Sequence, residues 1–150
     1  MSQHFVYIRL KPYLRQWIVN EFGSEPISFP KGSAEADLLE SLLAKKTRSG
    51  ADFPIDESMI AIELPFYKHK NVRDYNYLSP RAQKAIERMI YIRFQVQMWE
   101  ELHTVDNTYR IIGDVIYAWL EAHGIEPTAQ NWETVRQMYY RKRKIYQNVK

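Results

Sequence analysis

The stretch FVYIRLKPYLRQWIVNEFG, residues 5–23, holds one strand and one helix and sets the fold class. Residues 5–10 are β-favouring side chains in rough alternation, which predicts a strand. Pro12 suits the first helical position, and apolar side chains at i, i+3, i+4 and i+8 from Leu14 mark one face of a short helix. Gly23 follows where a left-handed C-cap residue belongs.

The next segments add a second helix and a second strand. Residues 26–30 hold a short extended piece between two prolines, which suits the edge of a sheet. Ser33 can cap a helix with a leucine stripe, and Lys45 and Lys46 would lie near its negative end. Residues 59–64, Met-Ile-Ala-Ile-Glu-Leu, predict a strand that a proline stops.

Three helices are predicted in the rest of the chain. Ser79 and the proline after it match the start of a helix over about 80–103. A second helix spans about 108–123, with Gly124 as its C′ residue. The last begins at Pro127, and its apolar positions at about 100° per residue share one side. Those positions are Trp132, Val135, Met138, Tyr139, Ile145 and Tyr146.

We therefore expect an α+β fold with a small N-terminal sheet and two helices, followed by a C-terminal three-helix region ending in a basic helix. Residues 1–150 have the size of a single domain. Within it we expect an α/β lobe at 1–65 and a helical lobe at 79–150. An irregular connector at 66–78 would join them.

Composition narrows the class of protein. The chain has no cysteine, which excludes disulfides, thiolate metal sites and thiol nucleophiles and fits a reducing cytoplasm. The first ten residues lack the layout of a secretory signal. No apolar run reaches the roughly 18 residues that would predict a membrane span. We expect a cytoplasmic protein with no membrane partner.

No residue pattern indicates an enzyme, a cofactor or a metal site. The four histidines form no two-histidine ligand spacing on one helix, and the five glycines form no phosphate-binding loop. Glu100 and His103 make half of a di-iron pattern, which needs a second copy that the chain lacks. Asp52, Asp56 and Glu57 cluster without the spacing of a calcium loop. We expect no catalytic residues, no cofactor and no bound metal.

Charge is distributed unevenly along the chain. The net charge is only +3, but all eighteen acidic residues lie at or before Glu133. Six cations and no carboxylate follow that residue. A mildly acidic body with a basic end is a pattern that indicates a polyanionic partner, most often nucleic acid.

The last helix carries the first candidate binding region. Arg and Lys side chains attract phosphates and displace their counterions, and Tyr140 can reach bases or sugars. Lys142 interrupts the apolar stripe, so it must extend to solvent or the helix is leaving the core. The alternative is a solvated terminal helix whose cations suit its C-terminal dipole. The candidate residues are Arg136, Tyr140, Arg141, Lys142, Arg143 and Lys144.

Residues 67–73, Tyr-Lys-His-Lys-Asn-Val-Arg, form the second candidate region. Aromatic and basic side chains alternate there, as they do in surfaces that bind single strands or RNA. Lys68, Lys70 and Arg73 would contact phosphates. The alternative is a plain solvated loop whose tyrosines fold over the core.

Four stretches resemble uncharacterised proteins of similar length from bacterial prophages and mobile elements. The resemblance spans most of the chain and implies either nucleic-acid handling or a role in phage assembly, without an activity or functional residues. The stretches are FVYIRLKPYL (5–14), FPKGS (29–33), YLSPRA (77–82) and YAWLEAHGIEP (117–127).

The sequence thus predicts a non-enzymatic accessory or regulatory protein that binds DNA or RNA through its basic C-terminal helix. The alternative is a protein-interaction or assembly protein whose basic helix and surface aromatics dock another protein. The salt dependence of binding distinguishes the two hypotheses, because phosphate binding weakens steeply as the salt concentration rises.

Overall fold

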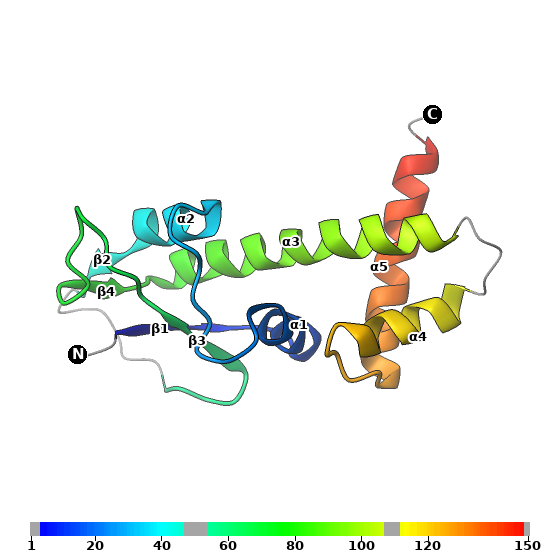
Figure 1. Ribbon diagram of the computed structural model, residues 1–150, viewed down its shortest axis with the longest axis horizontal. Helices are drawn as coiled ribbons and strands as arrows, with labels where there is room; N and C mark the ends of the chain where they lie inside the picture. The colour runs from blue at the N-terminus through cyan, green and yellow to red at the C-terminus, as the bar shows by residue number, and fades with distance from the viewer. Residues whose placement is uncertain (1–3, 47–53, 107–111, 149–150) are drawn as a thin grey trace. The chain divides into compact units, whose positions relative to one another are not determined.

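The computed structural model describes residues 4–46, 54–106 and 112–148 and has the predicted α+β architecture (Figure 1). The chain divides into two compact units, residues 1–90 and 91–150. Residues 66–78, expected to join two lobes, lie within the first unit. The elements are β1 (Phe5–Arg9), α1 (Pro12–Phe22), α2 (Ala34–Leu42), β2 (Ala44–Lys45), β3 (Met59–Glu63), β4 (Tyr75–Tyr77), α3 (Pro80–Asp106), α4 (Ile112–Ala122) and α5 (Ala129–Asn148).

Strands β1 and β3 form the centre of the first unit, close to the bounds predicted for them. They pair antiparallel, with Val6 opposite Ile62 and Ile8 opposite Ile60. These four side chains are buried. Because side chains alternate between the two faces of a strand, this register turns one apolar face of both strands into the core.

The predicted extended piece near residue 27 lies along the outer edge of β3. The Ile27 amide donates to the Ala61 carbonyl at 3.0 Å, and the Ile27 carbonyl accepts from the Glu63 amide at 2.8 Å. Ile27 itself is fully buried. The piece thus satisfies polar groups of β3 that β1 does not reach.

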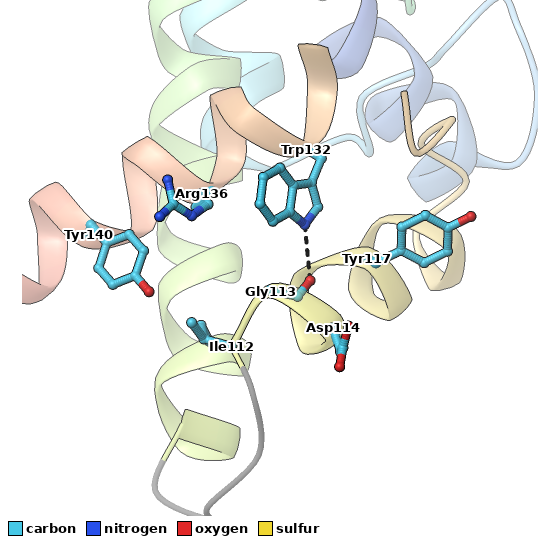
Figure 2. Close-up of a pocket in the computed structure, with 7 residues that line it drawn as sticks. All are labelled: Ile112, Gly113, Asp114, Tyr117, Trp132, Arg136 and Tyr140. Carbon is cyan, nitrogen blue, oxygen red and sulfur yellow. Dashed lines mark hydrogen bonds between the residues drawn. The ribbon is translucent and has the colours of Figure 1, made fainter. Parts of the chain in front are cut away.

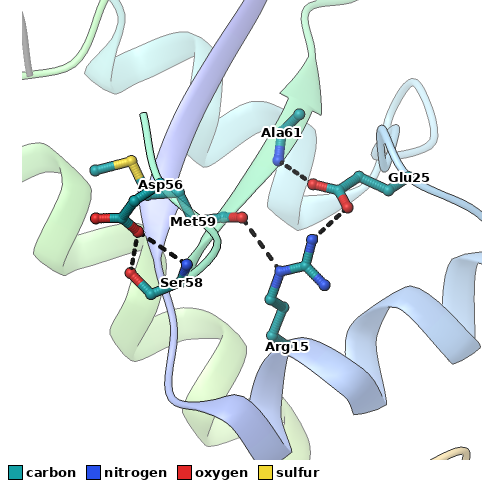
Figure 3. A network of polar contacts seen from close by, with 6 residues as sticks. All are labelled: Arg15, Glu25, Asp56, Ser58, Met59 and Ala61. Atoms are coloured by element: carbon teal, nitrogen blue, oxygen red, sulfur yellow. Dashed lines mark hydrogen bonds and ion pairs between the residues drawn. The ribbon is translucent and has the colours of Figure 1, made fainter. Parts of the chain in front are cut away.

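Two side chains cover the rest of that edge (Figure 3). Arg15 donates from Nε to the Met59 carbonyl at 3.2 Å, and the Ala61 amide donates to Glu25 at 3.0 Å. Arg15 and Glu25 also pair with each other. With these partners β3 presents few unpaired backbone groups to a second chain, which is how proteins commonly protect a sheet edge.

The helix ends at Ser33, Ser79 and Gly23 match those predicted from the sequence. The Ser33 hydroxyl accepts from the Ala36 amide at 3.1 Å, and the Ser79 hydroxyl accepts from the Ala82 amide at the same distance. Gly23 ends α1 with φ of 82°, a left-handed conformation that favours glycine. These ends were predictable because each depends on residues within one turn.

The end of α2 differs from the prediction. The helix stops at Leu42, and Lys45 lies in the short strand β2, which pairs with β4. Lys45 therefore lies just past the end of this helix, in a strand that the sequence analysis did not predict. This pairing joins segments about thirty residues apart, so no local pattern reveals it.

Tyr67 connects the segment before β4 to α2. Its buried hydroxyl donates a hydrogen bond to the Ala36 carbonyl at 2.9 Å. Burial, with smaller contributions from the charges of Glu40 and Asp37, raises the pKa of Tyr67 from 10.0 to about 12. The neutral hydroxyl is thus the form that the folded chain stabilises.

Alkaline pH is expected to destabilise the protein through Tyr67. Since its folded pKa lies above the unfolded value, the stabilisation is complete below about pH 10 and is lost as the pH rises towards about 12. The loss is about 2 kcal/mol by pH 12. Urea unfolding of the wild type and of Tyr67→Phe measures it. The advantage of the wild type should shrink and then reverse as the pH rises; a constant difference would contradict the assignment.

The second unit packs the C-terminal part of α3 with α4 and α5. Phe94 meets Trp119 edge-on at 5.6 Å between ring centroids. Glu101 accepts hydrogen bonds from the Trp119 indole at 2.5 Å and from His123 Nε2 at 2.8 Å, and thereby ties α3 to α4. The predicted helix start at Thr108 lies outside the described residues.

The end of α4 confirms the predicted Schellman cap. Gly124 has φ of 72°, and the Ile125 amide donates to the Leu120 carbonyl at 2.9 Å. Ile125 and Leu120 are both buried, which supplies the hydrophobic part of the motif. No helix in the described part of the chain is long and apolar enough to cross a membrane.

Candidate nucleic-acid interface

Helix α5 carries the first predicted region and is anchored at its start. The Thr128 hydroxyl accepts from the Asn131 amide at 3.1 Å, which caps the helix where the sequence places its beginning. Val135, Met138 and Tyr139 are buried. The predicted apolar side is therefore confirmed for these three residues, whereas Trp132, also expected on it, is half-buried and lies beside Arg136.

Beyond Tyr139 the helix leaves the core. Ile145 is 57% exposed and Tyr146 is 52% exposed, so neither is a core residue as the shared stripe suggested. Lys142 continues the face of the buried residues and is half-buried. The sequence left two explanations for Lys142: its side chain extends to solvent, or the helix leaves the core. The structure agrees with the second.

Trp99 of α3 holds this outer part of α5. Its ring stacks on Tyr146 with centroids 4.7 Å apart and planes within 4°, and on His103 at 4.5 Å. The Tyr139 ring lies 5.6 Å away. Aromatic pairs at these separations are attractive beyond the area they bury. The last turns of α5 thus have a side-chain anchor although they lie outside the core.

Four cations lie on the half of α5 that faces away from the buried Met138, spread over about 160° of the helix surface at 100° per residue, and we call this half the cationic flank. They are Arg136, Arg141, Arg143 and Lys144. At about 100° per residue, Lys142 falls on the opposite side. Arg141 and Lys144 are exposed and Arg143 is half-exposed. Among residues 4–46, 54–106 and 112–148, no carboxylate forms an ion pair with Arg141, Lys142 or Lys144.

Arg136 is positioned by its neighbours on the helix. Its guanidinium lies 5.5 Å from the Trp132 ring centroid and 5.1 Å from that of Tyr140, one helical turn away on either side. It also pairs with Glu133 at 3.4 Å. The two cation–π contacts hold a planar cation in a defined orientation on the surface.

A hollow of about 490 Å³, open to solvent, adjoins Arg136 (Figure 2). We call it the aromatic hollow. Beside it, the Trp132 indole donates to the Gly113 carbonyl of α4 at 3.0 Å. A Cβ on Gly113 would lie 3.2 Å from the Trp132 ring, so the close approach favours glycine. Its lining residues are Ile112, Gly113, Asp114, Tyr117, Trp132, Arg136 and Tyr140.

Sequence reasoning found only part of this hollow. It selected Arg136 and Tyr140 but missed Trp132, Gly113 and Tyr117. The spacing of Trp132, Arg136 and Tyr140, four residues apart on one helix, was a readable signal. The residues that α4 contributes to the hollow could not be predicted, because nothing in the local sequence indicates which residues of one helix face another helix.

Part of the second predicted region makes contacts within the fold. Lys70 donates to the Glu40 carbonyl at 2.6 Å and to the Leu43 carbonyl at 2.9 Å, and so satisfies the C-terminal end of α2. Lys68 and Arg73 are exposed on the first unit. Tyr67 is buried, as in the alternative of a solvated loop whose tyrosines fold over the core, while a phosphate contact through Lys68 and Arg73 stays a prediction.

Asp56, one of the residues considered for metal binding, is held by bonds within its own loop. Ser58 donates from its hydroxyl and its amide to Asp56, and these bonds, with Arg9 nearby, hold the pKa of Asp56 below its ordinary value of 3.8. Its predicted companion Asp52 lies outside the described residues. Within the described ranges, no three His, Asp or Glu side chains lie close enough to hold a metal ion.

Comparisons of the chain with protein-family models, with curated proteins and with solved structures found no match. The features of the molecule that indicate a function are thus α5 and the aromatic hollow.

Proposed function

We propose that this protein binds nucleic acid through the cationic flank of α5, as a non-enzymatic accessory or regulatory protein. The observation that carries the proposal is the flank itself, in which Arg141 and Lys144 are exposed and Arg136 and Arg143 are half-exposed on an anchored helix. Arg136 and Lys144 are eight residues apart, which is about 12 Å along a helix. Duplex DNA carries one charge per roughly 1.7 Å of its axis, so a flank of this length faces several phosphates.

The helix dipole is a weaker explanation of the same cations. It favours positive side chains in the last turn of a helix, and the effect fades beyond that turn. Helix α5 runs to Asn148, and its last turn contains no basic residue. Arg141, Arg143 and Lys144 precede that turn, so capping alone does not account for them.

The proposal is tested by the salt dependence of binding. Labelled single-stranded DNA, duplex DNA and RNA of equal length are titrated with the protein at several salt concentrations. Four phosphate contacts predict a slope of log K against log salt of about −3 for a single strand. That slope corresponds to roughly a 50-fold loss of affinity between 50 and 200 mM salt. Absence of binding to all three ligands at 50 mM salt would refute the proposal.

Protein docking remains the second candidate, because apolar side chains are exposed on the same unit. Ile92 and Val96 lie one turn apart on α3 and are 45% and 52% exposed. Exposed apolar positions of this kind occur in protein interfaces. Docking through them would depend little on salt, so the titration above also separates the two candidates.

A further inference from the structure

We propose that the aromatic hollow receives an unpaired nucleobase, so that the ligand of the protein is single-stranded. This inference rests on the proposed function and names its class of ligand. The cationic flank would hold the sugar-phosphate backbone, and the hollow would hold a base. Both features share Arg136, so one strand can engage them together.

The hollow offers flat surfaces on which a base can stack. Tyr117 is 47% exposed and Tyr140 is 36% exposed, and both residues are among those that line it. Arg136 adds a planar guanidinium between Trp132 and Tyr140 (Figure 2). Aromatic rings and arginine planes are the groups on which unpaired bases stack in single-strand and RNA recognition. A volume of about 490 Å³ lies within the range of small-ligand sites.

The charges favour a base inside the hollow and phosphates outside it. Asp114 is the carboxylate among the lining residues, and its side chain is exposed. A carboxylate repels a phosphate but can accept a hydrogen bond from the amino group of a base. Arg141 and Lys144, which form no ion pair with a carboxylate of the described residues, lie further along α5. The charge pattern therefore places the backbone along the flank.

A duplex would fit this arrangement poorly. Its bases are stacked and paired, and it presents base edges rather than base faces. Engaging the hollow would require a base to leave the stack, which costs several-fold to several-hundred-fold in affinity by the energies typical of flipping. A single strand makes the same contact without that loss.

The test compares three labelled 12-mers with the same number of phosphates: single-stranded oligothymidine, an abasic strand and a duplex. Fluorescence anisotropy at 100 mM salt measures the affinity of each. We expect oligothymidine to bind about 10-fold more tightly than the abasic strand, because only it can stack. We also expect it to bind more tightly than the duplex.

A pair of tyrosine variants tests whether the hollow is where the base of oligothymidine binds. Tyr117→Leu keeps an apolar side chain on α4 but removes the flat ring, and should lower oligothymidine affinity about 10-fold while the salt slope stays unchanged. Tyr91→Leu is the matched control on α3, outside the hollow. It should leave oligothymidine binding unchanged.

The outcomes distinguish this inference from the proposed function. Equal affinity for oligothymidine and the abasic strand, or a preference for the duplex, would overturn the inference while a steep salt slope still supported nucleic-acid binding. Tyr117→Leu indistinguishable from wild type would also overturn it. Failure of all three ligands to bind at low salt would remove both. A salt-insensitive protein ligand that competes for Tyr117 would assign the hollow to protein docking instead.

Discussion

Replacing Arg141, Arg143 and Lys144 together with Ala is expected to lower the affinity for a single strand about 100-fold at 100 mM salt. Each phosphate contact contributes about 0.7 to the salt slope, so the slope should become less steep by about 2. Alanine has the highest helix propensity, so α5 should remain helical. Anisotropy titrations at several salt concentrations measure both quantities, and circular dichroism verifies the helix content.

Two single variants show whether the position of a charge matters or only its presence. Lys144→Ala removes a cation from the flank, and Lys142→Ala removes one from the opposite side of the same helix. The net charge changes equally in both. The slope should fall by about 0.7 for Lys144→Ala and change little for Lys142→Ala. Equal effects would show that binding responds to overall charge and not to a defined flank.

Trp99→Ala is expected to reduce both stability and binding, although it changes no charge. The ring contacts Tyr139, Tyr146 and His103, and a truncated aromatic of this size costs about 2–4 kcal/mol of unfolding free energy when it is partly buried. The outer turns of α5 would lose their anchor, and a flank that must be ordered upon binding binds more weakly. Urea unfolding measures the first effect and anisotropy the second.

Trp99→Phe supplies the control for this variant. It keeps an aromatic ring on α3, so most of the stability and most of the affinity should return. If Trp99→Ala loses stability but binds single strands as the wild type does, the anchoring of α5 would have no part in binding.

Much of the fold was predictable because its signals are local. Ser33, Ser79, Gly23 and Gly124 each mark a helix end, and each depends on groups within about one turn. The apolar alternation of residues 5–9 and 59–63 likewise predicted both strands of the central pair. The α+β class follows from these elements together.

The sequence did not reveal the structural position of a residue where that position depends on contacts with distant segments of the chain. Lys45 was expected near a helix end, but β4 draws it into a strand. Lys70 was expected to contact phosphate, but it lies where the carbonyls of α2 need a donor. Ile145 was expected on the buried side, but it is 57% exposed, because this part of α5 extends beyond the core. In each case the local sequence is compatible with both outcomes and tertiary contacts choose between them.

The most direct test of the account is to map the backbone amide shifts of the isotope-labelled protein during titration with single-stranded oligothymidine. The account predicts that the shifts concentrate on α5 between residues 136 and 144 and on α4 around Tyr117, and that they diminish as salt is raised. Shifts confined to the first unit, or none on α5 at saturating oligonucleotide, would contradict it.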